Sequence, residues 1–310
     1  MPELPDITIY RERLTAFTVG HAPARVRVLN PFVLRTVTPS PSVLEGTRVM
    51  AVTAIGKRLV LAFEHSRFLV IHLMIAGRFK WKDRTGSAAP KLTGKLGLLA
   101  IDFEHGTLEL TEASTKKRAS VHLVRGDDAL RAMDPGGVEP LGLTRANFAR
   151  VLTRENRTLK RALTDPHIFS GIGNAYSDEI LHAAKLSPLA RTASLRDDAV
   201  GALHEAIETT LTAWTEKLRS EAKDTFPEKV TAFRPEMAVH GKFGKPCPEC
   251  GAPVQRIVYA ENESNYCARC QTEGRLLADR AFSRLLRDDW PKTLEELETR
   301  KTLYATRPSR

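Results

Sequence analysis

The chain has 310 residues, 42% of them hydrophobic, which is enough for about two domains with buried cores. It has no apolar run of the roughly 18 residues that a membrane span needs, and no apolar signal segment at its start, so we expect a cytoplasmic protein. Its 47 Lys and Arg against 37 Asp and Glu give a net charge of +10. This excess favours a polyanionic partner, nucleic acid before an anionic membrane surface.

The first stretch, "MPELPD", predicts a helix and leaves one question open. Asp6 is a good N-cap residue, and apolar residues follow it at helical spacing: Ile7, Tyr10, Leu14 and Phe17. A small residue after Met1 favours removal of that methionine, which would leave Pro2 as a free secondary amine. The stretch can therefore either lead into the helix only or present Pro2 as a reactive group.

Short apolar runs after this helix predict the strands of a β-sandwich or barrel. The runs span residues 48–56, 58–63, 67–77, 96–103 and 107–112, with polar or turn-forming stretches between most of them. A polar loop rich in small residues is expected over 83–95. These elements define a predicted N-terminal domain of residues 1–133.

Helical periodicity begins after a stretch rich in proline and glycine, "DPGGVEPLGL", which we interpret as a linker over 134–143. Residues 144–165 carry apolar side chains at helical spacing. A later helix is expected after Ser194, which forms a variant of the capping box with Asp197. The predicted helical domain covers 144–235.

Two glycines between these helices mark a candidate ligand site. Gly171 and Gly173 bracket one residue, and Asn174 follows just before a helix predicted from Ala175. Glycines let the backbone come close to a partner, and amide donors at a helix N-terminus suit a phosphate. A tight helix–helix turn without a ligand explains the same pattern.

The four cysteines form two C-x-x-C pairs, Cys247 with Cys250 and Cys267 with Cys270. This spacing favours one tetrahedral zinc ion over two disulfides or a redox motif. Because all four ligands are thiolates, the ion would be structural. We assign residues 236–275 to a zinc finger and 276–310 to a helical, charged extension.

Several of these motifs, in this order, resemble the formamidopyrimidine-DNA glycosylase and endonuclease VIII family of base-excision repair enzymes. They are "PELPD", "GKRL" at 56–59, "IHL" at 71–73, "GIGNAYSDEIL" and "VHGKFGKPCPEC…NYCARCQ", and the match extends over roughly residues 2 to 271. The resemblance implies an α+β fold: a β-sandwich with an N-terminal helix, then a helix–two-turn–helix domain with a β-hairpin zinc finger. It also implies a monomer that holds damaged double-stranded DNA between the two parts.

The resemblance answers the question raised by "MPELPD". It implies that Pro2 is the nucleophile that forms a Schiff base with C1′ of a damaged nucleotide, and that Glu3 is the general acid/base. Lys57 belongs to the same implied catalytic group. The implied activity is that of a bifunctional DNA glycosylase and AP lyase on oxidised or ring-opened bases.

The implied DNA contacts are more widely spread along the chain. Lys57, His72 and Asn174 correspond to residues that grip phosphates around the lesion, Lys57 and His72 as possible cations. Gly171 and Gly173 shape the turn before Asn174, and Lys117 with Arg118 are the basic residues of "STKKRAS" (114–120).

Three departures from the family pattern concern lesion specificity. Asn262 stands where the finger has an arginine that clamps phosphate. Ile75 stands in place of a methionine that fills the gap left by the flipped base, and Ala119 in place of an aromatic wedge. Residues 222–237 lack the threonine- and glycine-rich loop of the family.

These departures keep a second hypothesis open: a DNA-structure-binding protein of the same fold that does not cut. A zinc-ribbon transcription factor is a third hypothesis, which accounts for the cysteines and the charge but not for the N-terminus.

Overall fold

The computed structural model describes residues 1–86, 90–227, 230, 234–259, 262–278, 285 and 289–305. The chain divides into two compact units. Unit 1 contains Met1–Gly137 and Thr212–Ala232, and unit 2 contains Val138–Leu211 and Phe233–Arg310. The finer domain boundaries drawn from the sequence stay predictions. Among the described residues, no helix is both long and apolar enough to cross a membrane.

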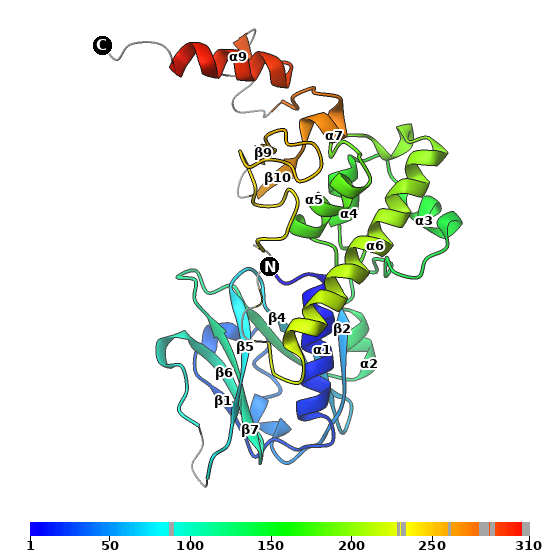
Figure 1. Ribbon diagram of the computed structural model, residues 1–310. Coiled ribbons are helices and arrows are strands. Elements are labelled where there is room, and N and C mark those ends of the chain that lie inside the picture. The colour runs from blue at the N-terminus through cyan, green and yellow to red at the C-terminus, as the bar shows by residue number, and fades with distance from the viewer. Residues whose placement is uncertain are drawn as a thin grey trace. The chain divides into compact units, whose positions relative to one another are not determined.

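Unit 1 is built on two four-stranded antiparallel sheets (Figure 1). One sheet has the order β2 (Val49–Ile55), β3 (Arg58–Phe63), β4 (Arg67–His72) and β8 (Ser120–Arg125). The other has the order β1 (Arg25–Val28), β6 (Gly97–Asp102), β7 (Gly106–Glu112) and β5 (Gly77–Asp83). Apolar residues from both sheets enter one core, among them Leu59, Leu69, Leu99 and Leu108. The predicted β-sandwich is therefore confirmed.

The strand predictions needed one correction. The apolar run 67–77 is not a single strand, because β4 ends at His72 and β5 begins at Gly77. A tight turn between them places Met74 at φ +53°. No predicted run covers β1, β8 or the part of β5 after Gly77. Strand β1 has only four residues, two of them arginine, and both β5 and β8 place polar residues between apolar ones.

The first helix, α1 (Leu4–Thr18), lies beside β2 in unit 1 and places Tyr10 and Leu14 in its core (Figure 1). Its N-cap is Glu3, so the prediction of Asp6 as N-cap was wrong. Asp6 instead occupies the third helical position, where its Oδ2 accepts the Glu3 backbone N–H at 2.9 Å. This is the reciprocal half of a capping box, which a single-residue preference does not reveal. Unit 1 also contains the short helix α2 (Asp127–Arg131), three 3₁₀ turns (Pro31–Val33, Pro41–Leu44, Gly94–Leu96) and the part of α6 (Asp197–Ala222) from Thr212 onward.

Unit 2 combines helices with a β-hairpin. Its helices are α3 (Arg145–Leu152), α4 (Leu159–Thr164), α5 (Asn174–Ala183), the part of α6 (Asp197–Ala222) up to Leu211, α7 (Ala268–Thr272) and α9 (Leu294–Ala305). The antiparallel strands β9 (Gln255–Tyr259) and β10 (Asn262–Tyr266) form the hairpin. A 3₁₀ turn at Thr192–Ser194 precedes α6, and Ser194 Oγ donates to Arg191 O at 2.9 Å. The capping-box prediction for Ser194 was therefore wrong, although a helix does follow it.

Candidate functional site

The N-terminal residues are held against α1 in unit 1. Pro2 is buried, and the Glu3 side chain is only 2% exposed. The Glu3 carboxylate accepts the Asp6 backbone N–H, while Asp6 accepts the Glu3 backbone N–H. These reciprocal bonds fix Glu3 next to Pro2 at the positive end of the α1 dipole.

The α-amino group sits in a partly buried and charged environment. Burial lowers the pKa of the Met1 amine below its usual value, and the charges of Arg78 and Lys57 act in the same direction. Glu3 and Asp6 oppose them with their negative charges. A depressed amine pKa increases the neutral, nucleophilic fraction at neutral pH. Sequence reasoning missed Arg78, whose proximity depends on the start of β5.

A hydrogen-bonded turn between β4 and β5 exposes Ile75. Gly77 N donates to Leu73 O at 2.8 Å, and a Cβ at Gly77 would lie 2.2 Å from that oxygen, so only glycine fits. Arg78 Nη1 donates to Ile75 O at 3.1 Å and to Gly77 O at 2.6 Å. The Ile75 side chain, 58% exposed, is thus presented to solvent on a braced backbone.

Lys57 and His72 lie near one another in the sheet of β2, β3, β4 and β8. Lys57 follows Gly56 in the turn between β2 and β3, and His72 pairs with Arg58 across the β3–β4 ladder. Burial, together with the charges of Arg58 and Lys57, lowers the pKa of His72 to about 4. His72 is therefore a neutral imidazole at pH 7, and the expectation of a second cation there is corrected. It can still donate one N–H to a phosphate.

The loop before β8 is organised by one buried carboxylate. Glu112 accepts the backbone N–H groups of Arg118, at 2.9 Å, and of Ala119, at 3.0 Å. Lys117 Nζ donates to the Glu112 carbonyl oxygen. Ala119 is 1% exposed and belongs to the core, so this position does not present a side chain to a ligand. Lys117 and Arg118 are half-buried.

In unit 2 the glycine-rich turn leads directly into α5. Gly171 has φ +80°, Gly173 is the N-cap, and Asn174 is the first helical residue, one position earlier than predicted. The Asn174 carbonyl oxygen accepts from Lys160 Nζ at 2.7 Å. This hydrogen bond therefore connects the first residue of α5 to α4.

Lys160 also belongs to a buried polar network centred on Asp178. Asp178 Oδ1 accepts from Lys160 Nζ at 2.5 Å and from Ser264 Oγ at 3.0 Å, and Oδ2 lies 2.9 Å from His240 Nδ1. Burial would raise the pKa of Asp178, but the Lys160 charge and the His240 hydrogen bond hold it below its usual value. Neighbouring Glu179 accepts three backbone N–H groups, those of residues 238–240. The network links α4, α5 and the hairpin, and sequence analysis did not find it.

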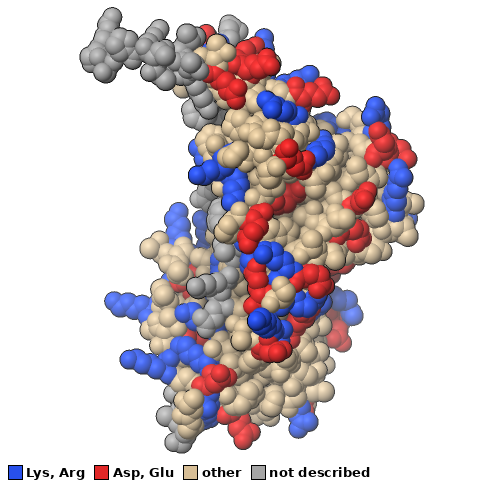
Figure 2. Space-filling model, viewed as in Figure 1, with Lys and Arg blue, Asp and Glu red and all other residues tan. Residues whose placement is uncertain are grey.

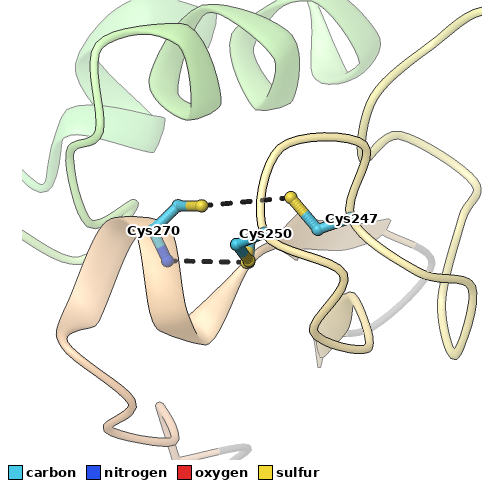
Figure 3. A group of neighbouring side chains, drawn as sticks. Cys247, Cys250 and Cys270 are labelled. Carbon is cyan, nitrogen blue, oxygen red and sulfur yellow. Dashed lines mark hydrogen bonds between the residues drawn. The ribbon is translucent and has the colours of Figure 1, made fainter.

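The four cysteines converge at the base of the hairpin and fit one zinc ion. All four sulfurs lie within 4.8 Å of one another and form no disulfide. Cys247 Sγ lies 3.9 Å from Cys270 Sγ (Figure 3), and Cys250 Sγ lies 3.3 Å from Cys267 Sγ. Tetrahedral Zn–S bonds place sulfurs about 3.8 Å apart, which is the scale observed. The predicted structural zinc site is confirmed, and its four cysteines would supply one thiolate for each position of a tetrahedral ion.

The finger presents a cation next to an aromatic ring. The Arg256 guanidinium lies 4.3 Å from the centroid of the Phe243 ring, and both side chains are exposed. Asn262 is the first residue of β10, and its side chain lies outside the described residues, as does part of the 222–237 segment. In Figure 2, Lys and Arg side chains also project from the part of unit 1 that carries β1, β5 and β6.

Comparisons with known proteins agree with these features along most of the chain. The N-terminal domain of formamidopyrimidine-DNA glycosylase matches residues 1–130, its H2TH domain matches 137–224, and the zinc finger found in FPG and IleRS matches 244–272. A β-sandwich with a buried N-terminus, an H2TH unit and a four-cysteine finger define a class of DNA-repair glycosylases.

Individual relatives identify the family. Formamidopyrimidine-DNA glycosylase of Thermus thermophilus is 32% identical over 281 residues, which cover 88% of this chain and 100% of that one. An uncharacterised formamidopyrimidine-DNA glycosylase-like protein of Mycobacterium tuberculosis is 39% identical over 152 residues, which cover 49% of this chain and 94% of that one. The chain belongs to the formamidopyrimidine-DNA glycosylase family.

Solved structures share the fold. Lactococcus lactis Fpg in complex with DNA containing an abasic site has a TM-score of 0.75 and 25% identity, covering 87% of this chain and 99% of that one. The wild-type Lactococcus lactis protein with N7-benzyl-Fapy-dG DNA has a TM-score of 0.74 at 24% identity, covering 87% and 100%.

Proposed function

We propose that this protein is a bifunctional DNA glycosylase and AP lyase that acts on oxidised or ring-opened bases in double-stranded DNA. The observation that carries the proposal is the N-terminus of unit 1. Pro2 is buried next to Glu3, and the α-amino group of the preceding Met1 has a pKa lowered by burial and by the positive charges of Arg78 and Lys57, surroundings that the Pro2 amine would share once Met1 is removed. Such an arrangement suits an amine nucleophile next to a general acid and close to anionic substrate. We further propose that the protein works as a monomer in the cytoplasm.

The chemistry begins once Met1 has been removed. The Pro2 nitrogen forms a bond to C1′ and loses its proton, while the bond from C1′ to the base breaks and the base leaves with a proton. Glu3 then protonates the sugar ring oxygen as the C1′–O4′ bond opens, which leaves an iminium between Pro2 and the sugar. Because this iminium has no N–H to lose, it stays charged and acidifies the C2′ proton. Loss of that proton expels the 3′ phosphate, and a second elimination expels the 5′ phosphate.

DNA binding would use donors from both units. We assign phosphate contacts to Lys57, His72, Lys117, Arg118 and Asn174, with Gly171 and Gly173 giving the backbone close access. Since C1′ is shielded inside a duplex, the nucleotide must be flipped out. The braced, exposed Ile75 is suited to fill the space that the base leaves. The structure of Lactococcus lactis Fpg with DNA containing an abasic site supports damaged DNA as the partner.

Borohydride trapping tests the mechanism. Protein whose mass shows loss of Met1 is incubated with a duplex carrying one AP site and then reduced. We expect a covalent adduct that maps to Pro2, and no strand cleavage by P2G. E3Q should reduce the rate of base excision more than the yield of the adduct trapped at an AP site. The aldehyde of an AP site is already ring-opened, so it needs no acid at the ring oxygen. Absence of an adduct under conditions of tight duplex binding would refute the lyase assignment.

The alternative is a DNA-structure-binding protein that does not cut. The buried Ala119 favours it, because the loop at 114–120 offers no aromatic wedge at that position. The two functions differ in the effect of P2G: a binding protein would hold AP-site DNA equally well before and after the substitution and would leave the strand intact in both.

A further inference from the structure

The zinc finger is docked on the C-terminal end of α5 by three polar contacts within unit 2. His182 Nε2 lies 3.3 Å from Cys247 Sγ. Lys185 Nζ pairs with the Glu249 carboxylate. Gln271 Nε2 donates to Leu186 O at 2.8 Å, and Gln271 Oε1 accepts the Cys267 backbone N–H. All three contacts involve a zinc ligand or a residue directly next to one: Cys247, Glu249 beside Cys250, and Gln271 beside Cys270.

The contact of His182 has the geometry of a hydrogen bond to a ligand sulfur. The side chain is 2% exposed, so water does not compete for Nε2. A zinc-bound cysteine is a thiolate and can only accept, so Nε2 must be the donor. The other ring nitrogen, Nδ1, lies 3.7 Å from Glu249 Oε1. Lys185 holds that carboxylate, which lies two residues after Cys247 and one before Cys250.

Four thiolates on one divalent ion carry two excess negative charges. N–H donors reduce the charge on the sulfurs, lower their affinity for protons and fix their orientation. We propose that His182 is a positioning residue for zinc: its Nε2–H holds the Cys247 thiolate on the ion and joins the finger to α5. Inside the finger, the backbone N–H group that donates to a cysteine sulfur belongs to the cysteine-bearing segment itself, as Cys270 N does toward Cys267 Sγ. His182 differs because it reaches in from a helix 65 residues earlier in the chain.

A pair of substitutions separates the hydrogen bond from the packing of the ring. H182F keeps an apolar ring of similar size and removes the donor. H182Q places an amide N–H near the position of Nε2. H204F is the control, because His204 also lies in unit 2 and makes one hydrogen bond, at 2.7 Å to Leu143 O, away from the cysteines.

The first measurement is zinc release from the full-length, zinc-loaded protein into a chromogenic chelator. Loss of a partner of a metal ligand typically costs 10- to 100-fold in affinity. We therefore expect release to be about tenfold faster in H182F, and close to the wild-type rate in H182Q and H204F. The second measurement is alkylation of zinc-loaded protein by iodoacetamide, followed by peptide mass spectrometry. Here H182F should speed modification of Cys247 more than that of the other three cysteines.

Two results would overturn the proposal. One is that H182F releases zinc and is alkylated at the same rates as the wild type. The other is a uniform increase at all four cysteines, which would mean general loosening of the finger. If H182F does not fold, H182Q is the deciding variant. Zinc release from H182Q close to the wild-type rate supports the donor role, and release about tenfold faster than that of the wild type refutes it. Both measurements are independent of AP lyase activity.

Discussion

Replacing Asp178 by asparagine tests whether the buried network holds α5 in place. Asp178 is fully buried and accepts from Lys160, Ser264 and His240. An asparagine keeps the size but has one acceptor oxygen where the carboxylate has two. Its NH₂ group would face donors, and the Lys160 ammonium, 5% exposed, would lose its counter-charge.

The expected loss follows from this geometry. Removing one partner of a buried ion pair costs about 3–5 kcal/mol, because the remaining charge stays buried without compensation. If the free energy needed to open α5 locally falls by this amount, amide exchange in α5 accelerates by more than about a hundredfold. Each 1.4 kcal/mol corresponds to a factor of ten. Replacing Lys160 by methionine in the same protein removes the uncompensated charge. The K160M/D178N double variant should therefore lose less stability than D178N alone.

Hydrogen exchange with mass spectrometry measures this directly. The test peptide covers α5, and a peptide covering β6 in unit 1 serves as the internal control. We expect faster exchange in α5 of D178N, unchanged exchange in β6, and partial recovery in the double variant. The reasoning would be refuted by unchanged protection of α5, or by equal losses in both peptides.

Three further predictions concern His72, Gly77 and Arg256. A histidine has a pKa near 6.5 in the unfolded chain, whereas the pKa of His72 in the folded protein is about 4. The free energy of unfolding should therefore fall by about 3 kcal/mol as the pH drops from 6.5 to 4. Denaturant titrations should show a weaker pH dependence for H72Q. G77A places a Cβ 2.2 Å from Leu73 O and should lower the free energy of unfolding by about 2–3 kcal/mol, measured by the same titrations at pH 7. R256A should weaken binding to AP-site duplex and reduce the slope of log K against log salt by about 1, measured by fluorescence anisotropy.

Each of these has a contradicting outcome. Parallel pH profiles for the wild type and H72Q would show that His72 does not titrate as its burial implies. A G77A protein as stable as the wild type would mean that the turn after β4 relaxes freely. An unchanged salt slope in R256A would exclude a phosphate contact at that position, and K245A, on the same finger, provides the comparison.

The sequence by itself determined the features that depend on neighbours along the chain. Short apolar runs separated by polar or turn-forming stretches located most strands of the sandwich, because strands are short segments that enter a shared core between turns. The C-x-x-C spacing identified the zinc ligands, because two residues between thiolates suit one tetrahedral ion. The glycines before Asn174 located the turn into α5 to within one residue.

Tertiary structure decided what depends on distance through space and on burial. Arg78 approaches the N-terminal amine only because β5 starts where it does, and no local pattern contains that distance. His72 is neutral because its neighbours remove water and contribute positive charge, whereas its residue type alone allowed a cation. Asp178 and Lys160 are 18 residues apart, and Asp178 and His240 are 62 apart, so their pairing appears only in the folded chain. Spacing along the chain fixes local geometry, while pKa values and polar networks depend on which distant groups share a solvent-excluded volume.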